Sequence, residues 1–396
     1  MPRLRFPGFE GEWEEQCLET FMCSRDERQI PSPDAPLMAF IANLGVAPKG
    51  ERYDREYLVK SKDKEYKRTE FNDFIYSSNN LDVGSIGLNK YGRAVISDVY
   101  EIFTMKDGYA PEFISELVQR PHNLHKVLRF RQGCLYGQYR IYASDFLSVK
   151  LLAPDNEEQF KIAGFLQLID TRITAQRRLV ELLKKHKRGL SNGLFSGKVR
   201  MVRNAKWKTY RLGDIVRRVT RKNGKASDVP LTISAQYGLI DQREFFSKAV
   251  ASADMSGYYL LKQGEFAYNR SSSGEYPFGS IKRLERYNQG AVSTLYICFE
   301  VLGDKDDAEF LKWYFDSFAW HREVGMICAE GARNHGLLNV PTDGFFDTKH
   351  ILPSDKDERK NIAALMALAD ARCERAETEL TRLTALKSGL LQQLFA

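Results

Sequence analysis

Two stretches of the sequence combine basic, amide, hydroxyl and aromatic side chains, a mixture suited to contact with nucleic acid. They are YSSNNLDVGSIGLNKYGR, residues 76–93, and YNRSSSGEYPFGSIKRLER, residues 268–286. RFRQGCLYGQYR (129–140) and VRRVTRKNGK (216–225) add more arginine and lysine. Arginine can bind a guanine edge through two hydrogen bonds, asparagine and glutamine can bind adenine, and serine, lysine and backbone amides can hold phosphates. We interpret these stretches as candidate DNA-contacting loops; the alternative is ordinary solvated surface charge.

The side chains expected to contact DNA carry a positive charge, an amide or a hydroxyl, and lie in these stretches or in EGARNHGLLNV (330–340). In the first half of the chain they are Ser77, Asn79, Asn80, Lys90, Arg93, Arg131, Gln138 and Arg140. In the second half they are Arg221, Lys222, Asn269, Arg270, Ser271, Ser272, Lys282, Arg283, Arg333 and Asn334. Because such clusters occur in both halves, a shared binding role is favoured over chance.

The sequence contains no recognisable catalytic motif. There is no GxxxxGK[ST] phosphate loop, no GxG pattern suited to S-adenosylmethionine or a dinucleotide, and no Pro-Pro dipeptide of the kind found in amino-methyltransferases. No Ser-His-Asp or Cys-His arrangement has sequence context behind it. Pro33-Asp34 and Glu65-Tyr66-Lys67 can be forced into a nuclease-like pattern, but strings this short arise by chance in a chain rich in lysine and glutamate. The sequence therefore predicts binding rather than catalysis.

No metal site or disulfide framework is expected either. His122 and His125 are three residues apart, but no cysteine or carboxylate pair nearby completes a metal-binding set. The six cysteines are widely spaced and form no CxxC pair, so we expect them to be reduced thiols.

Length and composition indicate a globular protein of two or three domains. The chain has 396 residues, of which 43% are hydrophobic and 28% charged. Its 59 lysines and arginines exceed its 52 aspartates and glutamates, and the net charge of +7 favours a polyanionic partner only weakly. No apolar run is long enough to span a membrane, and the N-terminus lacks a secretory h-region, so we expect a cytoplasmic protein.

The candidate loops belong to two copies of one internal repeat. EEQFKIAGFLQLID, residues 157–170, is echoed by DERKNIAALMALAD, residues 357–370. The offset of 200 residues is constant in these segments and drifts to smaller values in the regions between them. A constant offset in the helical segments and a drifting offset between them predict that the two halves have the same function but act on different targets.

Each echoed segment begins a long helix with an apolar heptad seam. In the first copy the seam residues are Ile162, Leu166, Ile169, Ile173, Gln176, Val180, Leu183, Lys187, Leu190 and Leu194. In the second they are Ile362, Met366, Ala369, Cys373, Ala376, Leu380, Leu383, Lys387, Leu390 and Leu394. This spacing predicts that the two helices pack on each other as an antiparallel coiled coil, related by a pseudo-twofold axis. The two seam lysines are expected to extend their stems toward water.

The predicted fold class is therefore α+β. Strand-like segments such as FIYSS and FAYN, together with short amphipathic helices, indicate mixed α/β lobes in tandem. We expect a first globular lobe at 1–153 and a first spacer helix at 154–200. A second globular lobe at 201–352 and a second spacer helix at 353–396 complete the repeat.

In several segments the sequence resembles the specificity subunit of type I restriction-modification systems. The resemblance is carried by LRFPGFEGEWEEQCL at the start, by the duplicated EEQFKIA and DERKNIA, and by KKHKRGLSNGLFSG and LTALKSGLLQQLFA at the two helix ends. It covers the whole chain, including the repeat order and size. It implies that each lobe recognises one half of an asymmetric, bipartite site in double-stranded DNA, while the helices set the gap between the half-sites.

The resemblance also implies partners and the location of the chemistry. Two modification subunits would dock on the helices and bring S-adenosylmethionine, and restriction subunits would add ATP- and Mg-dependent translocation and cleavage, so this chain would hold no cofactor. Two alternatives stay open from the residues alone. One is a self-sufficient DNA methyltransferase or nuclease, and the other is a coiled-coil scaffold that binds proteins.

Overall fold

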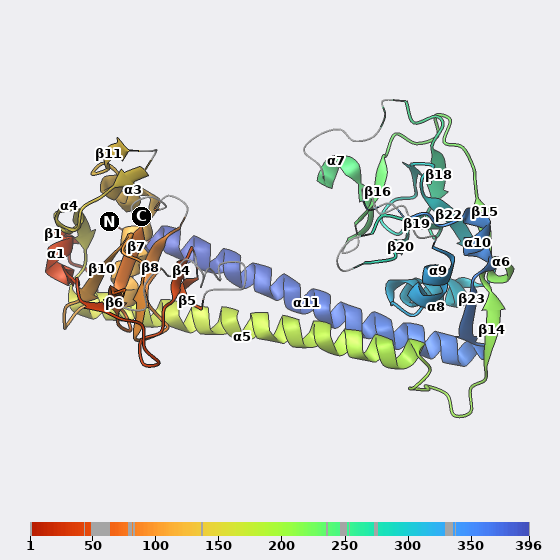
Figure 1. The fold of residues 1–396 in the computed structure, drawn as a ribbon, viewed down its shortest axis with the longest axis horizontal. Coiled ribbons are helices and arrows are strands. Elements are labelled where there is room, and N and C mark those ends of the chain that lie inside the picture. Colours follow the sequence, from red (N-terminus) through yellow and green to blue (C-terminus); the bar gives the residue numbers. More distant parts are fainter. Residues whose placement is uncertain are drawn as a thin grey trace. The chain divides into compact units, whose positions relative to one another are not determined.

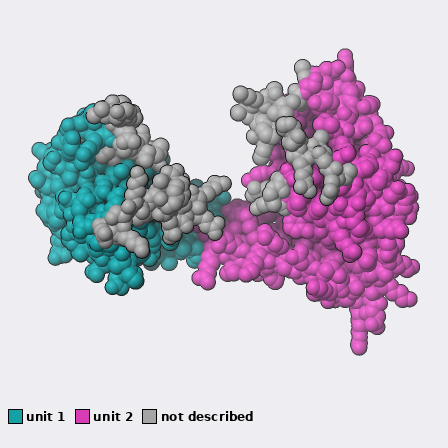
Figure 2. Space-filling model, in the orientation of Figure 1, with its two compact units in different colours: residues 1–176, 379–396 teal, residues 177–378 magenta. Residues whose placement is uncertain are grey.

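The computed structural model describes most of the chain as two compact units (Figure 2). The described residues are 2–42, 44–48, 64–77, 81, 84–135, 138–234, 237–245, 252, 254–272, 276–328, 336 and 338–395, with the backbone alone described at 134, 135, 138 and 245. Unit 1 comprises residues 1–176 and 379–396, and unit 2 comprises residues 177–378. The boundary between the units thus passes through both long helices.

Unit 1 contains an antiparallel sheet with the strand order β2-β10-β7-β8 (Figure 1). Its elements are β1 (Glu14–Cys17), α1 (Leu18–Phe21), β2 (Met22–Ser24), β3 (Arg28–Gln29), β4 (Ala39–Ile41), β5 (Gly45–Ala47), β6 (Tyr66–Thr69), β7 (Phe74–Ser77), β8 (Ile86–Leu88), β9 (Ala94–Ile96), β10 (Tyr100–Met105), α2 (Pro111–Gln119), α3 (Pro121–Leu128), β11 (Gln132–Leu135), β12 (Gln138–Arg140), α4 (Ala143–Leu147) and β13 (Lys150–Ala153). The rings of Phe74, Tyr76, Phe103 and Phe146 stack in its core.

Unit 2 repeats this sheet with the strand order β15-β22-β19-β20. Its elements are β14 (Trp207–Arg211), α6 (Leu212–Ile215), β15 (Val216–Val219), β16 (Leu231–Ser234), β17 (Gly238–Asp241), α7 (Gln242–Phe245), β18 (Tyr259–Lys262), β19 (Phe266–Asn269), β20 (Ser280–Arg283), β21 (Gln289–Val292), β22 (Ile297–Val301), α8 (Lys305–Asp316), α9 (His321–Ile327), α10 (Thr342–Asp347) and β23 (Lys349–Pro353). Phe266, Phe299, Phe315 and Phe345 form an equivalent aromatic core. The matching strand orders confirm the internal repeat and the mixed α and β lobes.

In both units the first strand of the lobe pairs with the last one. β1 pairs antiparallel with β13, and β14 pairs antiparallel with β23. Because β13 and β23 lead directly into the long helices α5 (Asn156–Phe195) and α11 (Lys356–Leu394), each lobe begins and ends beside a helix N-terminus. Asp155 and Asp355 cap these helices, since their Oδ1 atoms accept hydrogen bonds from the amides of Glu158 and Glu358 at 2.8 and 3.2 Å.

In each unit α5 and α11 lie side by side and run antiparallel (Figure 1). In unit 2, Lys184 of α5 pairs with Glu377 of α11, while Lys187, further along α5, pairs with the earlier residue Asp370. The seam is buried at Ile162, Leu166, Ile173, Val180, Leu194, Ile362, Met366, Cys373, Ala376, Leu383 and Leu394, and half-buried at the remaining seam positions. Lys187 and Lys387 do not extend into water as expected; both are held in ion pairs.

The segment that precedes the first strand is attached to a helix end in the same way in both units. In unit 1 the amides of Arg3 and Leu4 donate to the carbonyl of Gln393 at 2.9 and 3.1 Å. In unit 2 the amide of Val199 donates to the carbonyl of Gly193 at 3.0 Å. Gly193 and Gln393 are equivalent positions of the repeat.

A buried glutamate reinforces each of these junctions. Glu158 binds the guanidinium of Arg5 through both carboxylate oxygens at 3.0 and 2.6 Å. Glu358, its equivalent, accepts hydrogen bonds from the amides of Met201 and Val202. Both glutamates are fully buried, so each carboxylate depends on these partners. Within the described residues, no helix combines the length and apolar character that crossing a membrane requires.

Candidate nucleic-acid interface

A two-stranded ribbon in unit 1, together with the residues beside it, carries two arginine–tyrosine stacks. β11 and β12 form this ribbon, with Gln132 paired to Arg140 and Leu135 to Gln138. The guanidinium of Arg131 lies 5.2 Å from the ring centre of Tyr139, and that of Arg140 lies 4.8 Å from the ring centre of Tyr142. Both tyrosines are exposed, as is Arg140. The ribbon thus presents planar cations held against aromatic faces.

The base of the ribbon is fixed to the central sheet of unit 1. The hydroxyl of Tyr76, in β7, donates to the carbonyl of Ile141, just after β12, at 3.0 Å. Arg140 Nη2 lies 3.7 Å from Glu101 Oε1, and Glu101 also binds Lys67 Nζ at 2.9 Å. The position of the arginines is therefore set by the folded core rather than by a free loop.

The other predicted contact residues of unit 1 are divided between the core, the surface and undescribed positions. Ser77 is buried at the end of β7, and its amide donates to the carbonyl of Ser85 at 2.9 Å. Lys90 is paired with Glu112, and Arg93 Nε lies 2.9 Å from Glu70 Oε1. Asn79 and Asn80 lie outside the described residues, as does the side chain of Gln138.

In unit 2, the predicted contact residues after β19 border the segment that leads into α10. Arg270 donates to the carbonyl of Leu295 at 3.2 and 2.8 Å and to that of Val340 at 3.1 Å. The carbonyl of Arg270 accepts from the amide of Leu338, and the amide of Ser272 donates to Gly336. These bonds bring together two loops that lie far apart in the sequence. Arg270 supports this arrangement with all three of its guanidinium nitrogens.

The hydroxyl and amide groups of the same loop are left at its surface. Ser271 and Ser272 are exposed, and Asn269 is half-buried with its Oδ1 accepting from the amide of Ser271 at 3.1 Å. Arg333 and Asn334 lie outside the described residues.

The basic residues of β20 and of the turn after β15 are engaged within unit 2. Lys282 pairs with Asp316, and Arg283 is held by Glu285 and Glu309. Arg221 forms a two-nitrogen ion pair with Glu265 at 3.3 and 3.0 Å, and this hydrogen bonding raises the pKa of Arg221. Lys222 donates to the carbonyl of Gly257 at 2.9 Å and lies over the ring of Tyr259. The charges of Lys282, Arg283 and Arg221 are thus partly neutralised by carboxylates.

Sequence reasoning missed the aromatic members of the candidate surface. Tyr139 and Tyr142 support the unit 1 arginines, and the sequence signal for them is the alternation of arginine and aromatic residues in RFRQGCLYGQYRIY. In unit 2 the rings of Tyr276 and Phe318 meet edge to face at 6.0 Å near the loop after β19, and Phe318 is exposed. No short-range signal in the sequence joins these two rings.

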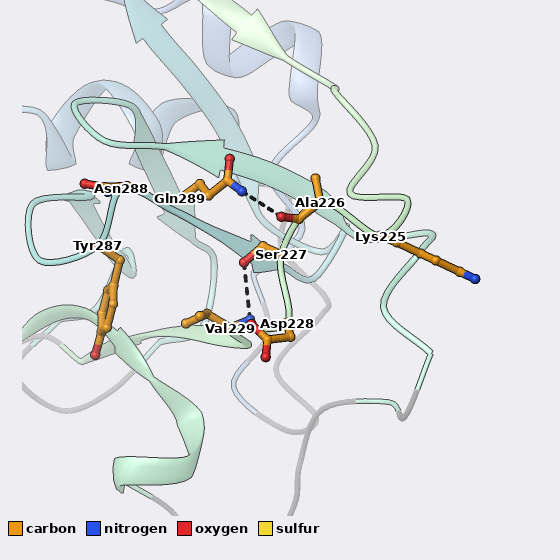
Figure 3. Close-up of a pocket in the computed structure, with 8 residues that line it drawn as sticks. All are labelled: Lys225, Ala226, Ser227, Asp228, Val229, Tyr287, Asn288 and Gln289. Carbon is orange, nitrogen blue, oxygen red and sulfur yellow. Dashed lines mark hydrogen bonds between the residues drawn. The ribbon is translucent and has the colours of Figure 1, made fainter.

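A separate pocket lies in unit 2. It is lined by residues 225–229 and 287–289 (Figure 3). Gln289 Nε2 donates to the carbonyl of Ala226 at 2.6 Å, and Ser227 Oγ accepts from the amide of Val229 at 3.2 Å. These polar groups hold the pocket wall together. Across the residues that the structure describes, no group of three or more histidine, cysteine, aspartate and glutamate side chains is placed to hold a metal ion.

No protein-family model matches the sequence, and no curated protein matches it. Solved structures do match the fold. The crystal structure of the type I restriction-modification system S subunit from M. genitalium aligns with a TM-score of 0.58 at 15% identity, covering 100% of this chain and 99% of the other. A chain from a structural study of complex assembly and conformational transition of the type I R-M system aligns with a TM-score of 0.53 at 13% identity, with 98% of each chain covered. The chain therefore has the fold of type I S subunits.

Proposed function

We propose that this chain, with its S-subunit fold, is the DNA specificity subunit of a type I restriction-modification complex and is not itself catalytic. The observation that carries the proposal is the β11–β12 ribbon with its two arginine–tyrosine stacks, of which the stack of Arg140 on Tyr142 has both members exposed. The fold supplies the frame, because two repeated lobes on a pair of long helices suit a protein that contacts two separate stretches of duplex.

The ribbon has the dimensions and chemistry for the major groove of DNA. That groove is about 12 Å wide and admits a two-stranded β-ribbon. A guanidinium stacked on an aromatic ring loses little further freedom when it binds, and its outer nitrogens match O6 and N7 of guanine. We assign Arg140 to base contact and Arg131 to base or phosphate contact. In unit 2 the exposed Ser271 and Ser272, together with Asn269, are the described candidates.

The two lobes are proposed to recognise different half-sites. Their central sheets match, but the candidate contact groups differ: arginine–tyrosine stacks in unit 1, and serine and asparagine groups with an aromatic pair in unit 2. The described candidate groups thus differ in chemical type between the lobes, and different types favour different bases, so we infer an asymmetric target.

The helices are proposed to set the gap and to dock the modification subunits. They contain 40 and 39 residues, and a helix of that length spans about 60 Å. Leu168 and Leu368 occupy equivalent positions and have 72% and 65% of their surface exposed. Two equivalent exposed leucines fit two copies of one partner. S-adenosylmethionine, ATP and Mg would be bound by the modification and restriction subunits.

The decisive experiment assembles the chain with its modification subunits and maps methylated adenines in genomic DNA. We expect one bipartite sequence with a fixed gap. Exchanging residues 201–352 for the lobe of another S subunit should change one half-site and leave the other intact. If the isolated chain methylates DNA when given S-adenosylmethionine, it is an enzyme. If the complex shows no binding to duplex DNA that weakens as the salt concentration rises, the chain is a protein scaffold.

A further inference from the structure

Each seam lysine lies in an ion-pair cluster, and the two clusters are built from equivalent residues. In unit 2, Lys187 pairs with Asp370 and lies 4.0 Å from Asp316 Oδ2. In unit 1, Lys387 Nζ lies 2.8 Å from Asp170 Oδ1 and 3.4 Å from Glu116 Oε1. All three positions are separated by the 200-residue offset of the repeat. We call these two sets the lysine clusters.

Each lysine cluster joins three elements of one unit. The lysine comes from one long helix, the aspartate from the other, and the third acid from a lobe helix, α8 in unit 2 and α2 in unit 1. The third acid also binds a cation of its own lobe: Glu116 pairs with Arg120 at 2.7 Å, and Asp316 pairs with Lys282. The clusters therefore connect the helix pair to the lobe as well as the helices to each other.

The seam lysines are sheltered but fully compensated. Their side chains are 24% and 21% exposed. Burial acts to lower the pKa of Lys187, but its hydrogen bond and ion pair with Asp370 outweigh burial and raise that pKa above the ordinary value. Because a sheltered, charged lysine is costly to leave without its aspartate, an arrangement of the helices that separates the two is disfavoured.

Apolar side chains alone exclude a shift of one heptad less strictly than charged ones, because an apolar side chain needs no single partner. The two seam lysines each need an acid. A slip of one heptad in one direction would face Lys187 with Ala363 and Lys387 with Ala163. A slip in the other direction would face Lys387 with Arg177. Either slip leaves at least one sheltered lysine without its acid, which is how a single charged seam position selects one register in a coiled coil.

We propose that the two lysine clusters fix the register of α5 against α11 and seat each lobe on the helix pair, so that Lys187 and Lys387 are the positioning residues for the gap between half-sites. The last step, from register to gap, rests on the proposed function. The register itself is a property of the chain alone and is testable without DNA.

The register test measures a distance within unit 2. Encoded spin-label side chains at Arg178 and Arg375, both exposed, report the offset between the helices by electron-spin distance measurement on the full chain. The parent chain should give one narrow distance. The double variant Lys187→Met/Lys387→Met, which removes both lysine clusters, should broaden it or add a second component, because a slip of one heptad moves the helices about 10 Å past each other. The double variant Lys187→Arg/Lys387→Arg, which keeps both charges, should retain the narrow distance.

Val180→Ala is the matched control, because it weakens the apolar seam without touching a lysine cluster. It should retain the single distance. If the double variant Lys187→Met/Lys387→Met also gives the parent distance, or if Val180→Ala broadens it equally, the positioning role is wrong.

The second readout is the methylated-site map of the complex containing both Lys187→Met and Lys387→Met. We expect the half-sites to stay the same while a second gap, different by about three base pairs, becomes accepted. A shifted spin-label distance with an unchanged gap would uphold the register role and overturn the spacer part of the proposed function. An unshifted distance would overturn the further inference and leave the proposed function standing.

Discussion

Arginines from similar basic stretches occupy contrasting environments in this protein. The side chain of Arg140 is 64% exposed and rests on Tyr142, whereas that of Arg283 is 9% exposed and is held between Glu285 and Glu309. A guanidinium that is already surrounded by carboxylates has little to gain from DNA. The exposed and stacked arginine is therefore the better candidate for base recognition.

Replacing Arg140 should relax one position of the unit 1 half-site. We expect Arg140→Ala to reduce discrimination between bases at that position by about 1–3 kcal/mol. Arg140→Lys should keep the electrostatic attraction to DNA but lose the pair of hydrogen bonds to one base. Binding assays of the complex on substituted duplexes measure this effect. Arg28→Ala is the control, because Arg28 is an exposed, ion-paired arginine on β3. Uniform weakening on every sequence, with a smaller salt slope, would assign Arg140 to a phosphate instead.

His350 should make the stability of unit 2 depend on pH. Its ring is buried between the Tyr314 hydroxyl and the Thr348 hydroxyl, each 2.8 Å away, and burial lowers the pKa of His350 to about 4. The unfolded chain takes up a proton near pH 6.5, so stability is complete above that pH and is lost as the pH falls toward 4. We expect a loss of about 2 kcal/mol at pH 5 relative to pH 8.

Chemical unfolding followed across this pH range tests the histidine. His350→Gln should be less stable at pH 8 and should show a flatter pH profile. His321, whose pKa burial also lowers to about 4, contributes in the same direction, so the double variant should be flatter still. A parent-like slope in both variants would place the acid sensitivity elsewhere.

From the sequence, a candidate DNA-contacting side chain could be chosen only by its chemical type, not by the partners that it has in the fold. The sequence indicated that Arg270 and Arg283 lie in polar stretches, but their partners, such as Val340 and Glu309, are distant in the chain. Which arginine is used inside the fold depends on tertiary contacts that no local pattern encodes. Tyr139 and Tyr142 were recoverable in principle, because they alternate with arginines across a short hairpin.

At the scale of the elements, α5 offers a matched pair of leucines with opposite roles. Leu166 is 3% exposed in the seam, and Leu168 is 72% exposed on the outer surface. Leu166→Ala should destabilise the chain by about 2–4 kcal/mol through the cavity that it leaves. Leu168→Ala and Leu368→Ala should change stability by less than about 0.5 kcal/mol, yet weaken capture of the modification subunits.

Denaturation of the free chain and titration with purified modification subunit give the two readouts. We expect only Leu166→Ala to lower the free energy of unfolding of the chain. We expect Leu168→Ala and Leu368→Ala to lower its affinity for the modification subunit. If the outer leucines leave the affinity unchanged, the docking surface lies elsewhere on the chain.

The helices were more predictable than the strands, because a heptad pattern repeats locally and identifies both the element and its partner. The strands were predicted in position but not always in extent. AVISDVYEIF (94–103) has the β-branched and aromatic bias of one continuous strand, yet the chain turns after Ile96, where the amide of Tyr100 donates to the carbonyl of Ser97. β9 then pairs with β6, and β10 enters the central sheet. β-propensity alone gives no signal for that change of partner.

At the scale of the whole molecule, the gap between half-sites should follow the length of the helices. A heptad inserted between Gln176 and Arg177 in α5, and another between Leu380 and Thr381 in α11, would keep the seam in phase and leave both lysine clusters intact. We expect the gap in the methylated sequence to widen by about three base pairs, from an added length of about 10 Å. Insertion in one helix only is the control and should disrupt assembly. An unchanged gap after the paired insertion would contradict the spacer role.

The hydrogen bonds from Arg3 and Leu4 to Gln393 give this protein the topology of a ring. At one junction between the repeats the amide of Val199 donates to the carbonyl of Gly193, and at the other the carbonyl of Gln393, the equivalent position, accepts from the amides of Arg3 and Leu4. Because both junctions are held in the same way, the order of the two repeats in the gene should be interchangeable. A permuted gene, begun near codon 201 with a short linker between residues 396 and 1, would encode the same lobes on the same helices and would keep Leu394 and Phe395, which pack in unit 1. Recombination could then exchange either lobe as a cassette, and new DNA specificities could arise by shuffling rather than by gradual redesign of an interface.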